Sequence, residues 1–312
     1  MNDIARARVD KYLDKMSIDD VDFDQYMNVE EKARVKDAVN WKERLKNYQL
    51  GEDQEGLSLP WAKANDFRMR RGESTIHTGY NGHRKSMMLG LIQLAMVAQG
   101  EKCLSISLEM APHITLDRMV KQFVGNGTPS FPMHDVFFDF LMDKLFIYDQ
   151  VGTVKWKRVI AVSRYAIQEL DVTQVFLDSL MKFGILKKDL ETQAQFVDEL
   201  TTLGKDTGAH FHLVAHANKP SEKNEFNAPS KYDVSGSSDI TNMVDNVIIH
   251  HQNKQEVREY DQLFIVEKQR NPGGENPEPR YIFHFDEKSL QFKPYKTALN
   301  MTDEDWGRCK WA

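Results

Sequence analysis

The stretch Gly79-Tyr-Asn-Gly-His-Arg-Lys-Ser86 decides the fold of this chain. It follows the apolar segment 74–78 and opens the apolar run MMLGLIQLAMVAQ, so it joins a predicted strand to a predicted helix. In that context the backbone N–H groups of the loop and of the first helical turn bind anions. The pattern therefore predicts a loop that binds the phosphates of a nucleotide, made of Gly79, Tyr80, Asn81, Gly82, His83, Arg84, Lys85 and Ser86.

One residue departs from the usual pattern, G-x-x-x-x-G-K-[S/T], which has glycine immediately before the lysine. Here Arg84 occupies that position, and Gly82 lies two residues earlier. We expect the loop to tolerate Arg84 if the backbone there stays helical and the side chain points away. Lys85 would then reach the β- and γ-phosphates, and the hydroxyl of Ser86 would bind Mg²⁺. A chance glycine-rich turn before a helix is the alternative that the loop alone leaves open.

Beyond the loop, short apolar segments alternate with helical ones, which is typical of an α/β fold with a central, mostly parallel, twisted sheet. The pattern predicts helices over 85–99, 115–124, 155–170 and 190–205. It predicts strands over 74–78, 103–108, 145–148, 175–178, 211–215, 247–250 and 263–266, and a C-terminal hairpin of 281–285 and 289–293.

Two carboxylates follow predicted strands of this sheet. Glu109 comes directly after the strand that ends in Ser107-Leu, and Asp178 ends the strand Val175-Phe-Leu. Because the carboxyl ends of parallel strands meet at one edge, Glu109 is placed to orient a water and Asp178 to support Mg²⁺ beside Ser86. Each is also an ordinary solvated strand end, and their order along the chain is the stronger signal.

Composition limits the other classes of function. The chain has 312 residues, a net charge of −6, a pI near 6.0 and two cysteines, so no disulfide scaffold or four-cysteine zinc site is expected. No membrane span or signal peptide is recognised, and we expect a cytoplasmic protein, in the host cytoplasm if viral. Residues 1–55 read as a helical arm that packs on another subunit, with a helix starting near Asn28, and residues 56–312 as one ATPase domain.

Together these residues resemble the RecA-like motor domain of replicative hexameric DNA helicases, the DnaB/Twinkle/phage type, over roughly residues 55–295. Four blocks carry the resemblance: Arg68 through Ser86, Ser107-Leu-Glu-Met110, Val175 through Lys182, and Lys268-Gln-Arg-Asn271. Two further segments, 214–216 and 236–246, stand at family positions. No single block is specific, but their combination and order are.

The resemblance implies a role for each matching residue. Lys85 and Ser86 bind ATP and Mg²⁺, Glu109 is the general base, and Asp178 supports the metal. His216 stands where the family places a phosphate sensor. Lys268 and Arg270 reach the ATP of the neighbouring subunit, and Phe285 offers an aromatic face to the base. Ordinary structural roles are the alternatives: a core-edge histidine, surface ion pairs and a buried phenylalanine.

The resemblance also implies a ring, six subunits being the expected number, that moves 5′ to 3′ on single-stranded DNA. A separate primase, polymerase or loader is an expected partner, and no membrane is. Two loops after core strands would line the channel and contact DNA through Lys182, Lys187, Lys188, Asn218, Lys219, Lys223, Asn224 and Lys231. A solvated lysine-rich loop is the plain alternative.

Three other functions remain open on the sequence. A recombination ATPase of the RecA/RadA type shares the fold and Glu109. A nucleotide- or DNA-binding scaffold with impaired turnover is suggested by Arg84. A small-molecule kinase on the same fold would act without DNA. Adjacent His250 and His251 are not read as a metal site, because neighbouring residues of a strand face opposite sides.

Overall fold

A nine-stranded sheet organises the computed structural model, which describes residues 37–50, 56–61, 64, 66–219, 227–236, 239–255, 260–271 and 278–294. The strand order is β11-β10-β9-β8-β3-β7-β6-β4-β5. The six strands from β8 to β5 run parallel to one another, and β9, β10 and β11 continue the sheet with antiparallel pairing. The fold is therefore the predicted RecA-like α/β core with a C-terminal hairpin.

The strands of this sheet have the following bounds: β3 Ser74–Gly79, β4 Cys103–Ser107, β5 Leu145–Ile147, β6 Gln174–Asp178, β7 His210–His216, β8 Asn246–Gln252, β9 Gln262–Gln269, β10 Arg280–Phe285 and β11 Phe292–Pro294. The helices are η3 Ala38–Trp41, α2 Lys42–Gln49, α3 Lys85–Ala98, α4 Pro112–Val124, α5 Phe131–Leu141, α6 Trp156–Glu169, η4 Leu180–Lys182, α7 Leu190–Thr207, η6 Lys231–Asp233 and α8 Asp239–Met243. A separate small ribbon pairs β1 Leu57–Ser58 with β2 Arg68–Met69.

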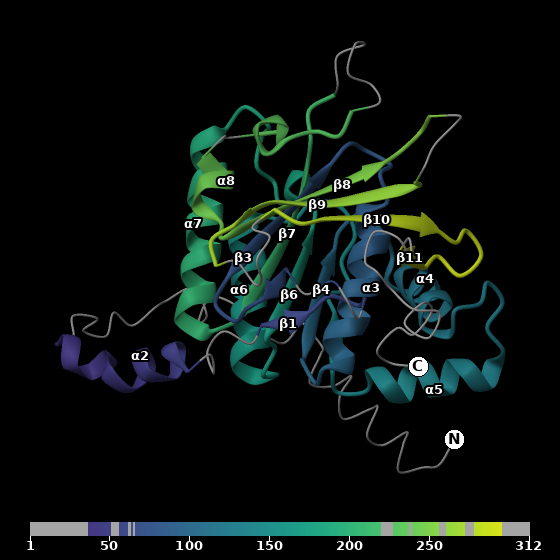
Figure 1. The fold of residues 1–312 in the computed structure, drawn as a ribbon, viewed down its shortest axis with the longest axis horizontal. Coiled ribbons are helices and arrows are strands. Elements are labelled where there is room, and N and C mark those ends of the chain that lie inside the picture. Colours follow the sequence, from purple (N-terminus) through teal and green to yellow (C-terminus); the bar gives the residue numbers. More distant parts are fainter. Residues whose placement is uncertain are drawn as a thin grey trace.

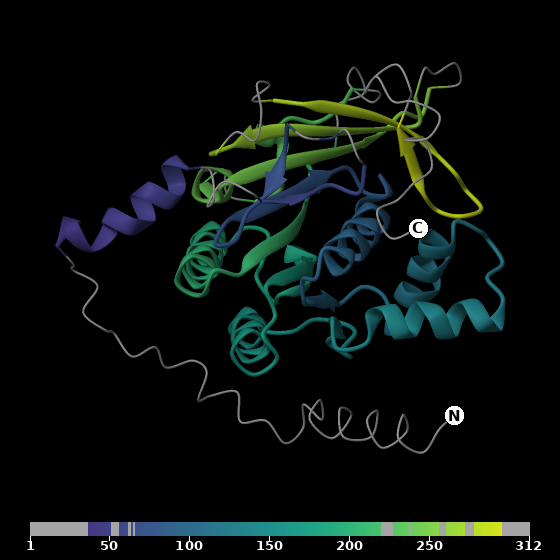
Figure 2. The same cartoon turned by 60° about the horizontal axis from the view of Figure 1, so that its bottom comes forward.

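Helices cover both faces of the sheet (Figures 1 and 2). The apolar residues of α6, α7 and α8 pack with one face, and those of α3, α4 and α5 pack with the other. Central strands buried on both faces need nearly continuous apolar runs, which is why this part of the fold is legible in the sequence. The segment before β2 packs on the antiparallel strands, where Trp61 stacks at 4.2 Å on Phe283 and donates from Nε1 to the carbonyl of Phe292 (2.7 Å).

The structure departs from the predicted elements in three places. Helix α5 was not predicted, because its residues FPMHDVFFDFL lack the spacing of a single apolar face. The last strand begins at Phe292 rather than at 289, since Asp286 caps the turn by accepting from the N–H groups of Lys288 and Ser289. The predicted helix start near Asn28, like most of the arm 1–55, lies outside the described residues, in which helical structure begins at Ala38.

Buried histidines form a chain of hydrogen bonds across the sheet. His77 on β3 contacts His250 on β8 (3.0 Å) and His212 on β7 (3.2 Å), and His212 contacts Gln174 on β6 (3.1 Å). Because an amide oxygen only accepts, Nε2 of His212 donates to it, and each following ring must then be neutral with a fixed proton position. Burial is the main cause that lowers the pKa of all three histidines, that of His77 to about 3.

No helix among the described residues has both the length and the apolarity to cross a bilayer.

Candidate active site

The loop predicted to bind phosphates joins the end of β3 to the start of α3, at the carboxyl edge of the parallel strands. Gly79 has φ +149° and lies so close to β8 that a Cβ there would come within 2.2 Å of the carbonyl oxygen of His250. Gly82 has φ +77° and faces open space. Only glycine fits the first position without displacing β8, whereas the second needs glycine for its backbone alone.

Arg84 does not have the backbone that we expected. Its φ and ψ are 60° and 23°, a left-handed conformation immediately before the helix. The prediction of a helical backbone at Arg84 is therefore wrong, because the loop must turn in the left-handed sense where the usual pattern has glycine. The side chain does point away: its guanidinium carbon lies 3.9 Å from the ring centroid of Phe285.

Lys85 lies across the base of the loop. Its ammonium group donates to the carbonyl oxygens of Gly79 (2.9 Å) and Tyr80 (2.8 Å), and only 5% of the residue is exposed. Burial lowers the pKa of Lys85 to about 8, although the carboxylates of Asp178 and Glu109 oppose that shift. The amine is therefore held near its titration point beside two negative charges.

The other loop residues divide into two groups. Tyr80, Asn81 and Gly82 are half-buried or exposed at the outer end of the loop. His83 is buried and belongs to the sheet, since its Nδ1 accepts from the N–H of Gln252 (3.0 Å) and its carbonyl accepts from Gln262 (3.2 Å). Burial, with neighbouring His251, lowers the pKa of His83 to about 3, so its neutral ring fixes the loop to β8.

The predicted metal-binding pair comes together. The hydroxyl of Ser86, in the first turn of α3, donates to a carboxylate oxygen of Asp178 at the end of β6 (2.5 Å). Burial raises the pKa of Asp178, and the hydrogen bond from Ser86 opposes that rise. A hydroxyl and a carboxylate are hard oxygen ligands, so the chemistry of this pair fits Mg²⁺.

Glu109 lies beside that pair with two polar neighbours. Its carboxylate accepts from the hydroxyl of Ser179 (2.7 Å) and lies 3.9 Å from Nε2 of His216. His216 first, and then Ser179, lower the pKa of Glu109 to about 2 against the effect of burial. At 3.9 Å His216 is beyond hydrogen-bond distance, so we regard the direct bond from Ser179 as the firmer contact. Glu109 is ionised at neutral pH.

The sheet register explains why these groups meet. Gly79 is paired with His216 across β3 and β7, and Ser107 is paired with Asp178 across β4 and β6. Glu109 follows Ser107 by two residues. Ser179 was not assigned a role from the sequence, although its position immediately after a strand-end carboxylate could have identified it.

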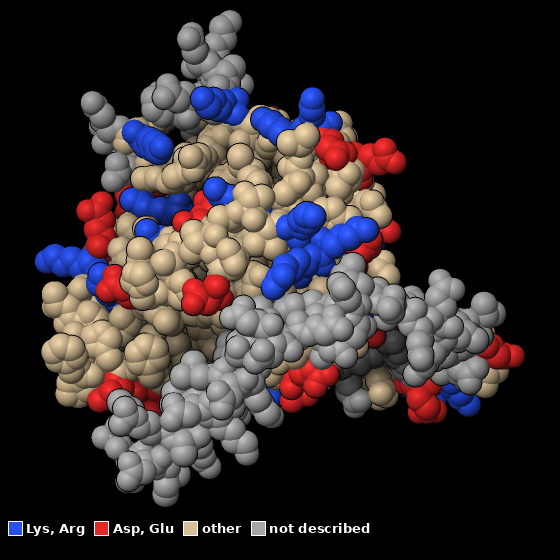
Figure 3. Space-filling model, turned by 180° about the vertical axis from the view of Figure 1, so that it is seen from behind, with Lys and Arg blue, Asp and Glu red and all other residues tan. Residues whose placement is uncertain are grey.

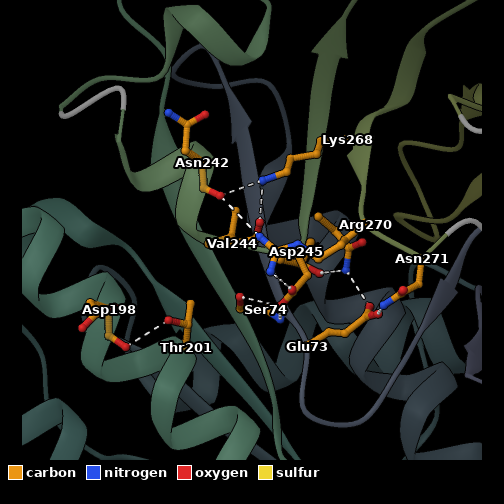
Figure 4. A network of polar contacts seen from close by, with 12 residues as sticks. Glu73, Ser74, Asp198, Thr201, Asn242, Val244, Asp245, Lys268, Arg270 and Asn271 are labelled. Atoms are coloured by element: carbon orange, nitrogen blue, oxygen red, sulfur yellow. Dashed lines mark hydrogen bonds and ion pairs between the residues drawn. The ribbon is translucent and has the colours of Figure 1, made fainter. Parts of the chain in front are cut away.

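Lys268 and Arg270 lie at the opposite edge of the sheet (Figure 4). Asn246 is paired with Gln269 on one side and with Thr75 on the other, so Arg270 is level with the start of β3. Five residues of strand separate Ser74 from Gly79, which at about 3.3 Å per residue is roughly 16 Å. These two side chains therefore do not contact the phosphate loop of their own chain.

Phe285 is 7% exposed and packs 4.9 Å from Phe292. The guanidinium of Arg84 lies over its ring. Gln252, with its amide turned so that both of its ends are satisfied, accepts from Arg84 (3.2 Å). Phe285 thus reaches the phosphate loop through Arg84, at the same sheet edge as the loop.

The predicted DNA-contacting residues lie on two neighbouring loops at the end of the molecule that is uppermost in Figure 1. Lys187 donates to the side-chain oxygen of Asn218 (3.3 Å), which joins the loops after β6 and β7. That end also carries several Lys and Arg side chains when the molecule is seen from behind (Figure 3). The remaining described members are exposed or half-buried, whereas two lie outside the described residues: Lys182, Lys188, Lys219 and Lys231 in the first group, Lys223 and Asn224 in the second.

Comparison with known proteins supports the fold. No protein-family model matches the chain. Among solved structures, the chain is similar to the ATPase domain of a DnaB-like helicase, with a TM-score of 0.68 and 13% sequence identity, covering 82% of this chain and 99% of that one. At that identity the likeness shows the architecture alone. The chain therefore has a RecA-like α/β fold whose carboxyl edge gathers Lys85, Ser86, Glu109, Asp178 and His216.

Proposed function

We propose that this chain is an ATP hydrolase and, more specifically, a DnaB-type DNA helicase motor that moves along single-stranded DNA as a ring. The observation that carries the proposal is the meeting of Lys85, the Ser86–Asp178 pair and Glu109 at one edge of the sheet. Hydrolysis of a phosphoanhydride needs a cation for the phosphates, oxygen ligands for a divalent metal and an ionised base for water, and these residues supply all three.

Each residue has a definite task in this proposal. Lys85 exchanges its two carbonyl partners for phosphate oxygens when ATP binds. Ser86 and Asp178 would hold Mg²⁺, which supplies positive charge against the charge that develops on the phosphates. Glu109, fixed by Ser179, orients a water and takes its proton.

The link from His216 to the adjacent loop supports a motor rather than a simple hydrolase. The carbonyl of His216 accepts from the N–H of Ser235 (2.7 Å), and Ala217 forms a bridge with Val234. A shift of His216 would therefore move the segment that carries Lys231 and Tyr232. The ring, its six copies, its polarity and its contacts with a primase, polymerase or loader are further parts of the proposal.

A scaffold with impaired turnover is the second candidate, and Arg84 is the observation that favours it. A left-handed arginine carries a conformational cost that glycine at the same position would not. Against it, the guanidinium lies over Phe285 rather than in the loop.

The substitution Glu109→Gln separates the candidates. It removes the base and keeps the shape, so we expect the ATP hydrolysis rate to fall by about 10²–10⁴-fold while binding of a fluorescent ATP analogue persists. Glu169→Gln is the matched control, because Glu169 is exposed at the end of α6, at the opposite edge of the sheet. Rates are measured with and without single-stranded DNA and with Mg²⁺ removed by a chelator.

Three results would argue against the proposal in different ways. A wild-type protein that binds ATP without hydrolysing it would favour the scaffold. Hydrolysis that Glu109→Gln leaves intact would remove the assigned base. Hydrolysis that ignores single-stranded DNA but responds to a small acceptor would favour a kinase.

A further inference from the structure

A buried carboxylate at the edge of the sheet opposite the phosphate loop is the starting point (Figure 4). Asp245, between α8 and β8, is only 4% exposed. One carboxylate oxygen lies 3.2 Å from Nη1 of Arg270, and the other accepts from the N–H (2.9 Å) and the hydroxyl (3.1 Å) of Ser74. Its backbone also joins both partners, since its N–H donates to Ser74 and its carbonyl accepts from Arg270, both at 3.0 Å.

Lys268 has a different position in the same network. Its ammonium group donates to three carbonyl oxygens at the end of α8, those of Thr241 (2.9 Å), Asn242 (3.0 Å) and Val244 (2.7 Å). An ammonium group has three protons, so these contacts use all of them. Lys268 therefore fastens the end of α8 to β9, and it would have to give up that role to bind a phosphate.

Arg270 keeps capacity for an outside ligand. Its side chain is 46% exposed, and its second terminal nitrogen makes only a long contact with the carbonyl of Asn242 (3.5 Å). A guanidinium has five N–H donors in a fixed plane, and a carboxylate on one edge orients the others. Since the loop of its own chain is roughly 16 Å away along β3, any nucleotide that it meets belongs to another copy.

We propose that Asp245 is a positioning residue, which holds the guanidinium of Arg270 in the orientation that completes the ATP site of a neighbouring copy. This inference rests on the proposed function, and it assigns the contact in trans to Arg270 and a structural role to Lys268. Asp245 also fixes Ser74, the first residue of the strand that ends in the phosphate loop. One carboxylate thus joins the strand that carries a subunit's own loop to the arginine that it offers to its neighbour.

A second layer supports this arrangement. Asn271, directly after Arg270, donates to one oxygen of Glu73 (2.7 Å), and Asn246, directly after Asp245, donates to the other (3.0 Å). Glu73 precedes Ser74, so the three neighbours of the central residues are tied together in the same way. Such a layer is what keeps a catalytic cation in one orientation.

The test uses mixtures of variants, because a shared site can be rebuilt from two defective subunits. Lys85→Ala keeps a working arginine and loses its own loop, whereas Arg270→Ala keeps its loop and loses the arginine. Mixed in equal amounts, they should restore activity at about a quarter of the sites, the fraction given by random pairing in a ring with head-to-tail contacts. Each variant alone should be nearly inactive.

Asp245→Asn is then tested in the same mixtures. Loss of orientation should lower its own hydrolysis rate by about 10²-fold, with binding of a fluorescent ATP analogue unchanged. We expect Asp245→Asn to be rescued by Lys85→Ala, which supplies a working arginine, and not by Arg270→Ala. Asp245→Glu, which keeps the charge, should be rescued in the same pattern from a smaller initial loss, and it serves as the second variant if the first unfolds.

The contrary outcomes are distinct. Rescue by Arg270→Ala and not by Lys85→Ala would mean that Asp245 serves its own phosphate loop through Ser74, and the inference would be wrong. Rescue by neither, in variants that melt like wild type, would also overturn it. Failure of the Lys85→Ala and Arg270→Ala mixture itself would instead reject the shared site in the proposed function.

Lys268 provides a separate readout. Lys268→Met should lower the melting temperature, because three carbonyl groups lose their donor, and wild-type turnover should persist at a temperature where the variant is folded. A Lys268→Met protein with unchanged melting temperature and a rate as low as that of Arg270→Ala would show that Lys268 acts on the nucleotide, and the division of roles would fail.

Discussion

Arg84 shows how one side chain can meet a backbone demand that usually falls to glycine. Its left-handed backbone costs about 1–2 kcal/mol relative to a relaxed residue. The contact of its guanidinium with Phe285 returns roughly 0.5–2 kcal/mol, depending on how much water is excluded. The loop therefore keeps its shape without the usual glycine.

Two substitutions at this position separate the backbone cost from the ring contact. Arg84→Ala loses the contact and keeps the backbone cost, whereas Arg84→Gly loses both. We expect the glycine variant to be more stable than the alanine variant by about 0.5–1 kcal/mol, measured as free energy of unfolding in urea. An alanine variant as stable as the glycine variant would mean that the left-handed conformation is not present in solution.

Lys85 should exchange a proton when a nucleotide binds. Burial lowers the pKa of its amine to about 8, so part of it is neutral near pH 8.5 in the free protein. Phosphate charges favour the protonated form, so binding at that pH should take up protons, and binding at pH 6.5 should not. Calorimetry in buffers of different ionisation enthalpy measures this uptake.

Lys85→Arg is the matched control for that measurement, because a guanidinium stays protonated throughout this range. It should bind with no proton uptake from this position at either pH. Equal uptake by both proteins at pH 8.5 would place the titrating group elsewhere.

At the scale of single elements, the parallel strands could be predicted because burial on both faces forces continuous apolar runs. Helix α5 could not, since several of its large apolar residues remain exposed and its pattern has no single face. The strand-end residues Glu109, Asp178 and His216 followed from topology. The partnership of Asp245 with Arg270 did not, because it joins segments that meet only through the antiparallel pairing of β8 and β9.

The histidine chain across β8, β3, β7 and β6 should make stability depend on pH. Burial keeps the pKa of His77, His212 and His250 below the unfolded value of 6.5, so between that value and the folded pKa the unfolded chain binds more protons. Stability is therefore full above about pH 6.5 and falls as the pH is lowered, by at most about 1.4 kcal/mol per pH unit for each ring.

The substitution His77→Leu tests this dependence. It leaves two buried ring nitrogens without partners and should cost about 1–3 kcal/mol at pH 7.5. The loss of stability between pH 7.5 and 5.0 should be smaller than in the wild type, since one buried base is gone. Urea unfolding at the two pH values gives the comparison, and a steeper dependence in the variant would contradict it.

At the scale of the whole molecule, the two sets of candidate residues lie at opposite edges of one sheet. Lys85 and Glu109 are at the carboxyl edge, and Arg270 is at the other. A chain on its own therefore has half of each of two sites. We expect ATP turnover per chain to rise with protein concentration until assembly is complete, in parallel with the size measured by light scattering.

Arg270→Ala is the informative comparison here. It should assemble as the wild type does and show a turnover that stays low at every concentration, because the missing group is chemical rather than architectural. Turnover per chain that is constant from fully dissociated to fully assembled protein would mean that one chain suffices.

The distance between the two edges has an arithmetical consequence. In an open row of copies, each junction makes one complete pair, and the two outermost copies leave one loop and one arginine without a counterpart. Closing the row adds the last junction and employs both, so a circle of any size wastes nothing, while a pair of copies uses only half of what it carries. Closure would then register as a step in turnover per chain, largest for the shortest rows.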